Sequence, residues 1–197
     1  MIAILDYGAG NLRSVQNTLA ELGAAYQLVR HAHQVRQAEK IILPGVGHFG
    51  QMLRALDALG VREALRERIA AGVPFLGICL GLQALFESSE EAPHLRGLGC
   101  FPGVVRRFAP DVRVPHMGWN NLERRKESRL LAGLDQSPYV YFAHSFYAPV
   151  GPFTAAACTY HVPYTAVLEA GQLFGVQFHP EKSGPAGLRI VANFLAL

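Results

Sequence analysis

Hydrophobic residues in the first half of the chain form short apolar runs that alternate with longer amphipathic stretches. Four runs are typical of buried strands: residues 2–5, 26–29, 41–43 and 73–78. Three stretches between them place apolar side chains at helical spacing: residues 12–22, 49–59 and 62–70. This repeated strand–helix alternation predicts a parallel sheet with right-handed crossovers.

The pattern changes in the second half, where short apolar runs are separated by turn residues. Strands are expected at residues 99–101, 104–108, 139–142, 154–159, 165–170 and 173–177. A hairpin is expected around residues 170–172, a helix at 186–195, and irregular structure at 111–135. We therefore predict an α/β fold of three layers, a single domain over residues 1–197, with a central mixed, mainly parallel sheet flanked by helices and antiparallel strands in the C-terminal half.

Composition narrows the possible partners and compartment. The net charge of +3 is small, and the one basic run, residues 124–126, lies between Glu123 and Glu127, which favours an exposed loop over a nucleic-acid site. Three cysteines without paired spacing argue against a disulfide framework or a zinc site and favour a reducing compartment. No apolar stretch approaches the roughly 20 residues that span a membrane. We predict a cytoplasmic protein without metal, cofactor, nucleic acid or membrane contact.

A candidate nucleophile, Cys79, lies where the strand at residues 73–78 meets a predicted helix beginning at Leu80. Gly77 precedes it by two residues and Gly81 follows it by two, and this spacing is typical of a nucleophile elbow, a sharp turn that exposes the central side chain. The N-terminus of the following helix would favour a thiolate there. An isolated cysteine is more often a core residue, so a base is needed to support the catalytic interpretation.

The best-placed base is His179, directly after the expected strand at residues 173–177. Glu181 follows two residues later, and in an extended chain both side chains would point the same way. Pro180 keeps His179 out of the helical region, which suits that arrangement. The carboxylate would orient the imidazole and favour its protonated form. We predict a Cys79–His179–Glu181 triad.

Backbone N–H groups that could stabilise an oxyanion are expected at Leu80 and in the Gly45–Gly47 loop, at Val46 and Gly47. A second glycine loop, Gly8 to Gly10, resembles a dinucleotide-binding turn. Ser14 lies near the position of the third glycine, however, and no acidic residue follows the second strand, so we do not expect a nicotinamide cofactor.

These segments together resemble a protein family. The elbow Gly77-Ile78-Cys79-Leu80-Gly81-Leu82-Gln83, the loop Pro44-Gly45-Val46-Gly47 and the run His179-Pro180-Glu181 resemble class I, triad-type glutamine amidotransferases, whose fold is flavodoxin-like. Five further segments resemble the glutaminase subunits of imidazole glycerol phosphate synthases: residues 6–11, 44–49, 116–120, 144–147 and 180–183. The similarity covers essentially the whole chain.

The resemblance implies a glutaminase that supplies ammonia to a (β/α)₈-barrel cyclase subunit in a heterodimer of histidine biosynthesis, and the cyclase forms imidazole glycerol phosphate and aminoimidazole carboxamide ribotide. It also implies that Gln83, His144, Ser145 and Phe146 hold glutamine. Phe146 stands where the family often has tyrosine. Segments containing Asn11, Trp119 and Lys182 would face the cyclase, although a core position for Trp119 is an equal alternative. Glutaminases of this family are typically almost inactive alone.

Other functions remain open from the sequence. The elbow and the His-Pro-Glu run are shared by glutaminase subunits of anthranilate, aminodeoxychorismate and pyridoxal phosphate synthesis. A cysteine hydrolase of the same fold that acts alone would not release ammonia from glutamine. A non-catalytic binding module would be unaffected by Cys79→Ala.

Overall fold

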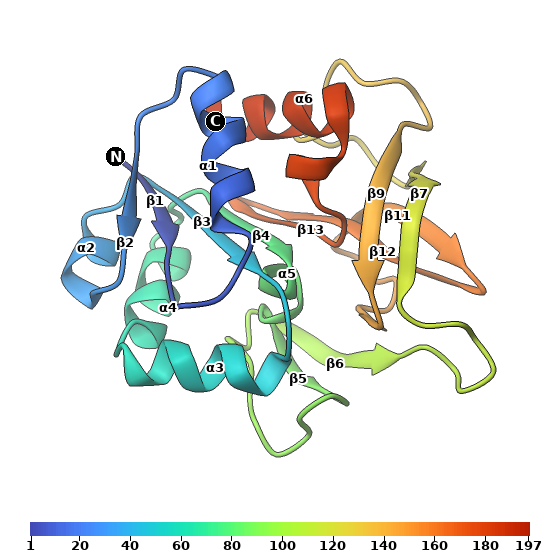
Figure 1. Ribbon diagram of the computed structural model, residues 1–197, viewed down its shortest axis with the longest axis horizontal. Coiled ribbons are helices and arrows are strands. Elements are labelled where there is room, and N and C mark those ends of the chain that lie inside the picture. The colour runs from blue at the N-terminus through green and yellow to red at the C-terminus, as the bar shows by residue number, and fades with distance from the viewer.

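The computed structural model describes residues 1–197 and has an eight-stranded sheet at its centre (Figure 1). The strands lie in the order β2–β1–β3–β4–β13–β12–β11–β8, and the five from β2 to β13 are parallel. The remaining three extend the sheet as antiparallel strands. Their bounds are β1 Ile2–Leu5, β2 Tyr26–Val29, β3 Lys40–Gly45, β4 Phe75–Cys79, β8 Glu123–Arg124, β11 Thr154–Tyr160, β12 Val162–Ala170 and β13 Leu173–Val176. The predicted mixed, mainly parallel sheet is confirmed.

Helices cover both faces of this sheet because the parallel strands alternate apolar side chains between two separate cores. On β1, Ile4 belongs to a core shared with Leu19 and Phe194, whereas Leu5 faces the opposite core. α1 (Leu12–Glu21) and α6 (Gly184–Leu195) therefore lie on one face, and α3 (Phe49–Ala58) and α4 (Arg62–Ala70) lie on the other (Figure 1). The three predicted long helices of the N-terminal half are confirmed within one residue at each end.

Two smaller sheets flank the central one. β5 (Phe86–Ser89), β6 (Phe101–Arg107) and β10 (Phe146–Tyr147) form a three-stranded sheet, and β7 (His116–Asn121) pairs with β9 (Tyr139–His144). The prediction of irregular structure at residues 111–135 is wrong for β7 and β8. The sequence of β7 is rich in glycine and asparagine, which are poor strand formers, and its ladder with β9 overrides that preference.

Three further differences concern short elements. The strands expected at residues 99–101 and 104–108 are one strand, β6, which continues through a left-handed Gly103. α2 (Ala32–Arg36) was not predicted, and α5 (Leu80–Gln83) is only one turn long. The hairpin around residues 170–172 is confirmed, with Ala170 paired to Leu173.

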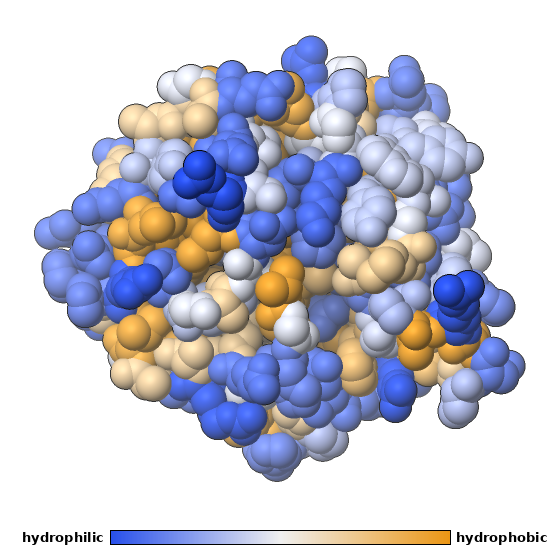
Figure 2. All heavy atoms as spheres, in the orientation of Figure 1, coloured by the Kyte–Doolittle hydropathy of each residue, from blue (hydrophilic) through white to orange (hydrophobic).

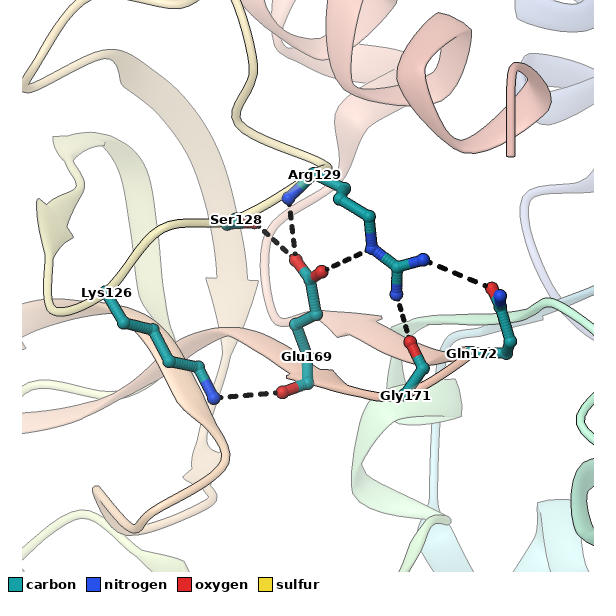
Figure 3. A network of polar contacts seen from close by, with 6 residues as sticks. All are labelled: Lys126, Ser128, Arg129, Glu169, Gly171 and Gln172. Carbon is teal, nitrogen blue, oxygen red and sulfur yellow. Dashed lines mark hydrogen bonds and ion pairs between the residues drawn. The ribbon is translucent and has the colours of Figure 1, made fainter.

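Glu169, near the end of β12, fastens the segment after β8 to this hairpin (Figure 3). Its carboxylate accepts hydrogen bonds from the Ser128 hydroxyl at 2.7 Å and from the Arg129 backbone N–H and Nε at 3.0 and 2.8 Å. The Arg129 guanidinium also reaches the Gly171 carbonyl and stacks over the Phe174 ring. Lys126 adds a bond from Nζ to the Glu169 carbonyl oxygen at 3.1 Å.

The surface differs in character from the two cores. On the face seen in Figure 2, hydrophobic residues form small separate patches among hydrophilic ones. None of the helices combines the length and the apolar character needed to cross a lipid bilayer.

Candidate active site

Three neighbouring parallel strands bring the predicted site residues to one edge of the sheet. β4 ends at Cys79 and lies between β3 and β13, with Gly45 paired to Cys79 and Val176 paired to Ile78. The Gly45–Gly47 loop therefore begins beside Cys79 on one side, and the segment leading to His179 begins on the other. The carboxyl ends of parallel strands are where open α/β sheets form their binding sites.

The backbone at Cys79 has the strained geometry expected of an elbow. Its backbone angles, φ 53° and ψ −108°, lie in a region that residues other than glycine rarely adopt. A Cβ added at Gly77 would lie 2.5 Å from the Gly81 carbonyl oxygen, and one added at Gly81 would lie 1.9 Å from the Leu43 carbonyl oxygen. Both glycines are therefore required for the turn to pack against itself and against β3.

The turn does not begin a long helix, which changes one part of the sequence interpretation. α5 has only four residues, so the field of a helix dipole at Cys79 is much weaker than expected. Stabilisation of negative charge on Cys79 has to come from individual donors and from His179.

His179 and Glu181 form a buried pair next to Cys79. Nδ1 of His179 lies 2.8 Å from Oε1 of Glu181, and their side chains are 3% and 2% exposed. The expected extended geometry holds for His179, with φ −100° and ψ 98°, but Pro180–Lys182 forms a 3₁₀ turn, η1. The turn, and not an extended strand, therefore brings the carboxylate under the imidazole.

Several effects set the protonation of His179. Burial is the largest and lowers its pKa, but hydrogen bonds to Cys79 and Glu181, together with their charges, raise the pKa to about 10. Because Nδ1 faces Glu181, Nε2 is the nitrogen left for Cys79. The imidazole is thus held as a cation that can give a proton to a group at the sulfur.

A cavity of about 170 Å³ opens directly in front of Cys79. Its volume is several times the roughly 30 Å³ share of one water molecule, so it can hold a small substrate. Its walls contain all three predicted oxyanion residues and all four predicted substrate-binding residues. The lining residues are Val46, Gly47, Cys79, Leu80, Gln83, Glu91, Pro115, Ala143, His144, Ser145 and Phe146.

The oxyanion loop contacts a buried tyrosine. Gly47 adopts a left-handed φ of 90°, and the Val46 side chain is 38% exposed. The Tyr7 hydroxyl is buried with no hydrogen-bond partner. Burial raises the pKa of Tyr7 to about 12, an effect that the nearby Val46 backbone partly opposes and Cys79 reinforces.

Two of the predicted substrate-binding residues, Gln83 and His144, contact the backbone carbonyl of a third, Phe146. The Phe146 oxygen accepts from Gln83 Nε2 at 2.8 Å and lies 2.8 Å from Nδ1 of His144. His144 continues into a buried cluster with His116 and Tyr164. Burial lowers the pKa of His144 to about 3 and that of His116 to about 4, so both rings are neutral and support the pocket wall.

Two polar residues of the site were not predicted from the sequence. Glu91 lines the cavity and its Oε2 accepts from the Phe49 backbone N–H at 2.7 Å. No motif surrounds Glu91 that could have indicated its position. Gln177 donates from Nε2 to Cys79 Sγ at 3.5 Å. It lies two residues before His179, and the same two-residue spacing that indicated Glu181 could have indicated it.

Two of the three predicted interface residues, Trp119 and Lys182, lie beside Tyr141. Trp119 is 56% exposed, so its alternative core position is wrong. Its ring meets the ring of Tyr141 edge-on at 6.1 Å, and Lys182 Nζ lies 5.9 Å from the centre of the Tyr141 ring. Asn11 accepts from Ser14 Oγ at 2.9 Å at the start of α1, and α1 packs against η1. Met117 and Tyr139 on β7 and β9 are also exposed.

Comparison with known proteins gives the same grouping throughout. Residues 3–197 match the family model of class I glutamine amidotransferases. The chain is 47% identical to imidazole glycerol phosphate synthase subunit HisH of Deinococcus radiodurans, over 98% of this chain and 92% of that protein. It is 46% identical to the protein of the same name from Methanothermobacter thermautotrophicus, over 100% and 98% of the two chains.

Solved structures show the same fold at lower sequence identity. A crystal structure of a glutamine amidotransferase superposes with a TM-score of 0.78 at 22% identity, covering 99% of this chain and 97% of that one. PurLQS from Thermotoga maritima superposes with a TM-score of 0.76 at 19% identity, with the same coverage.

Proposed function

The chain belongs to the class I glutamine amidotransferases and, within them, to the family of imidazole glycerol phosphate synthase subunit HisH, and from this premise we propose that it hydrolyses glutamine for a partner subunit. Cys79 is the nucleophile, His179 the acid and base, and Glu181 the residue that orients His179. The observation that carries this proposal is the buried His179–Glu181 pair beside a strained Cys79 that lines a small cavity.

The reaction proceeds through a thioester. The Cys79 sulfur attacks the side-chain amide carbon of glutamine, and His179 protonates the departing nitrogen, which leaves as ammonia. Water then attacks the γ-glutamyl thioester with His179 as the base, which releases glutamate and restores the sulfur. The raised pKa of His179, about 10, suits the first step, because the imidazolium is already present when the nitrogen leaves.

Recognition of glutamine is assigned to the opposite wall of the cavity. The Glu91 carboxylate lines this wall and would attract the α-ammonium group of the substrate. The backbone of Ser145 and Phe146 offers polar groups to its α-carboxylate, and the contacts of Gln83 and His144 to the Phe146 carbonyl keep that backbone in place.

The oxyanion that forms in both steps requires N–H donors at the sulfur. Leu80 supplies one N–H, and the Gly45–Gly47 loop supplies another from Val46 or Gly47. We propose that this loop rests with its peptide turned away and turns inward when the partner binds. The left-handed Gly47 and the exposed Val46 support such a movement.

The partner is a (β/α)₈-barrel cyclase that uses the ammonia to form imidazole glycerol phosphate in a heterodimer of histidine biosynthesis. The names of the relatives support this assignment, since a synthase subunit implies a second subunit. The proposed contact surface consists of Trp119, Lys182 and the half-buried Tyr141 between β7 and η1, together with Asn11 at the start of α1.

Glutamate release with and without a candidate cyclase and its ligand tests the proposal. We expect low turnover alone and a large increase in the complex, and expect Cys79→Ala to abolish turnover while complex formation persists. Equal turnover with and without the cyclase would contradict the loop movement. The synthases of anthranilate, aminodeoxychorismate and pyridoxal phosphate are the alternative partners. Full turnover with one of them, and none with the cyclase, would show that the cyclase is not the partner.

A further inference from the structure

Two glutamine side chains form a hydrogen-bonded chain between the wall of the cavity and the sulfur of Cys79. Gln83 Nε2 donates to the Phe146 carbonyl at 2.8 Å and to Gln177 Oε1 at 3.0 Å. Gln177 Nε2 in turn donates to Cys79 Sγ at 3.5 Å. Gln83 is 3% exposed and Gln177 is fully buried, so neither amide can exchange these partners for bulk water.

The Phe146 carbonyl fixes the direction of this chain. A carbonyl can only accept, so Gln83 must present its NH₂ group to Phe146. The same NH₂ group also faces Gln177, and Gln177 must therefore turn its oxygen towards Gln83. The NH₂ group of Gln177 is then the end that faces the sulfur. An NH₂ group donates and does not accept. The sulfur of a neutral thiol is only a weak acceptor, whereas a negatively charged sulfur accepts strongly, so this contact stabilises the thiolate more than the thiol.

We propose that Gln177 is a further catalytic residue, which donates a hydrogen bond to the Cys79 sulfur whenever the sulfur carries negative charge. The inference rests on the proposed function, in which Cys79 is the nucleophile. The sulfur is charged before it attacks the amide, and again when it leaves the thioester. Gln177 therefore acts in both halves of the reaction, and Gln83 is the positioning residue that orients it.

This role fits the elements around Cys79. α5 is too short to provide a strong helix dipole, so a side-chain donor has more to contribute. Gln177 is also uncharged, so replacing it removes a donor without changing the charge of the site. The ionisable groups that act on Cys79 or on its partner His179 are His179 itself, Glu181, Tyr7, Tyr164 and His144. All five remain in place when Gln177 is changed.

Alkylation of Cys79 by iodoacetamide measures this interaction in the full chain without substrate or partner. We expect Gln177→Met, which keeps length and bulk but has no donor, to slow alkylation near neutral pH roughly tenfold and to move the pH midpoint up by about one unit. Gln51→Met on the exposed side of α3 is the matched control and should match the wild-type rate. Burial raises the pKa of Cys100 and of Cys158 to about 11, so peptide mapping can separate their slower reaction.

Two further variants extend the test. One examines the hydrogen-bonded chain from Gln83 to Cys79, and the other replaces Gln177→Met if that variant does not fold. The Gln83→Met/Gln177→Met double variant should react no more slowly than Gln177→Met, because Gln83 acts on the sulfur through Gln177. Gln177→Glu has nearly the same shape and should slow alkylation more, because it puts an acceptor and a charge beside the sulfur. It carries the same test if Gln177→Met does not fold.

Wild-type rates and midpoints in Gln177→Met and Gln177→Glu would overturn the inference, and slower alkylation of the double variant than of Gln177→Met would show that Gln83 does not act through Gln177. In the complex we expect Gln177→Met to lower kcat for glutamine with little change in KM. Failure of the wild-type complex to release glutamate would overturn the proposed function instead, while the alkylation rates would still decide what Gln177 does at the sulfur.

Discussion

The proton on His179 links the chemistry of the site to the stability of the fold. Its pKa in the folded chain is about 10, above the ordinary value of 6.5. The folded state therefore holds this proton more tightly than the unfolded state does. The resulting stability is fully present below about pH 6.5 and is lost as the pH rises towards 10.

Glu181→Gln should reveal this dependence. The variant removes the charge that helps to keep His179 protonated, so we expect it to destabilise the fold more at pH 6 than at pH 10. Urea unfolding at both pH values measures the difference. Glu63→Gln, at an exposed carboxylate of α4, is the control. Equal destabilisation at both pH values would show that Glu181 does not act through the His179 proton.

The sequence predicts the position of some side chains of the site and not of others. Cys79, His179 and Glu181 could be predicted because elbow spacing and the two-residue spacing of His and Glu are local patterns. Glu91 enters the cavity because the segment after β5 lies against the start of α3. The residues around Glu91 in the sequence give no indication of that contact. The alternatives for Trp119 differed only in burial, which the packing of β7 against β9 decides.

At the scale of elements, the turn from β4 into α5 is held by crowding and not by hydrogen bonds alone. Gly81 touches the β3 backbone so closely that any side chain would overlap the Leu43 carbonyl. Strain in φ and lack of space are separate costs at such positions. Gly81, which lacks space, and Gly60, which has a left-handed φ, allow the two costs to be compared.

Gly81→Ala should destabilise the protein by about 3 kcal/mol or more, because α5 and β3 would have to separate. Gly60→Ala should cost only about 1 kcal/mol, since Gly60 has a left-handed φ of 63° but open space around it. Thermal unfolding of the two variants gives the comparison. Similar losses would mean that the turn tolerates a shift of β3.

The hydrogen bonds of Glu169 lead to a second prediction about how the elements are held together. Its side chain is 11% exposed and accepts three hydrogen bonds from Ser128 and Arg129. Glu169→Gln should therefore destabilise the fold by about 1–3 kcal/mol, with the glutaminase activity of the complex retained. The neighbouring exposed Glu127→Gln is the control. Loss of activity at full stability would point to a role of this segment in catalysis.

Elements with strong apolar periodicity were predicted closely, whereas elements formed by pairing were not. α4 and β2 have the predicted bounds, because their patterns are complete within a few residues. β7 and β8 depend on partners distant in sequence. α5 ends after one turn, where Ala84 and Leu85 lead directly into β5; apolar residues at that position suit either structure.

At the scale of the whole molecule, a substitution at the exposed Trp119 separates binding of the partner from stability of the fold. We expect Trp119→Ala to raise the Kd for the cyclase by about 30-fold, the equivalent of about 2 kcal/mol, with an unchanged unfolding midpoint. Calorimetric titration and thermal unfolding measure the two effects. Val104→Ala, at an exposed residue of β6, is the control. Unchanged affinity would remove Trp119 from the proposed contact surface.

The position of β13 has a consequence for how the site arises during synthesis. β13 lies between β4 and β12, although residues 173–176 are made after every other strand of the sheet. A growing chain, which folds from its N-terminus, therefore exposes Cys79 on an open strand edge without a base. His179 follows β13 directly, so the step that closes the sheet also delivers the base. Chains that end before residue 179 are therefore expected to be inert towards glutamine.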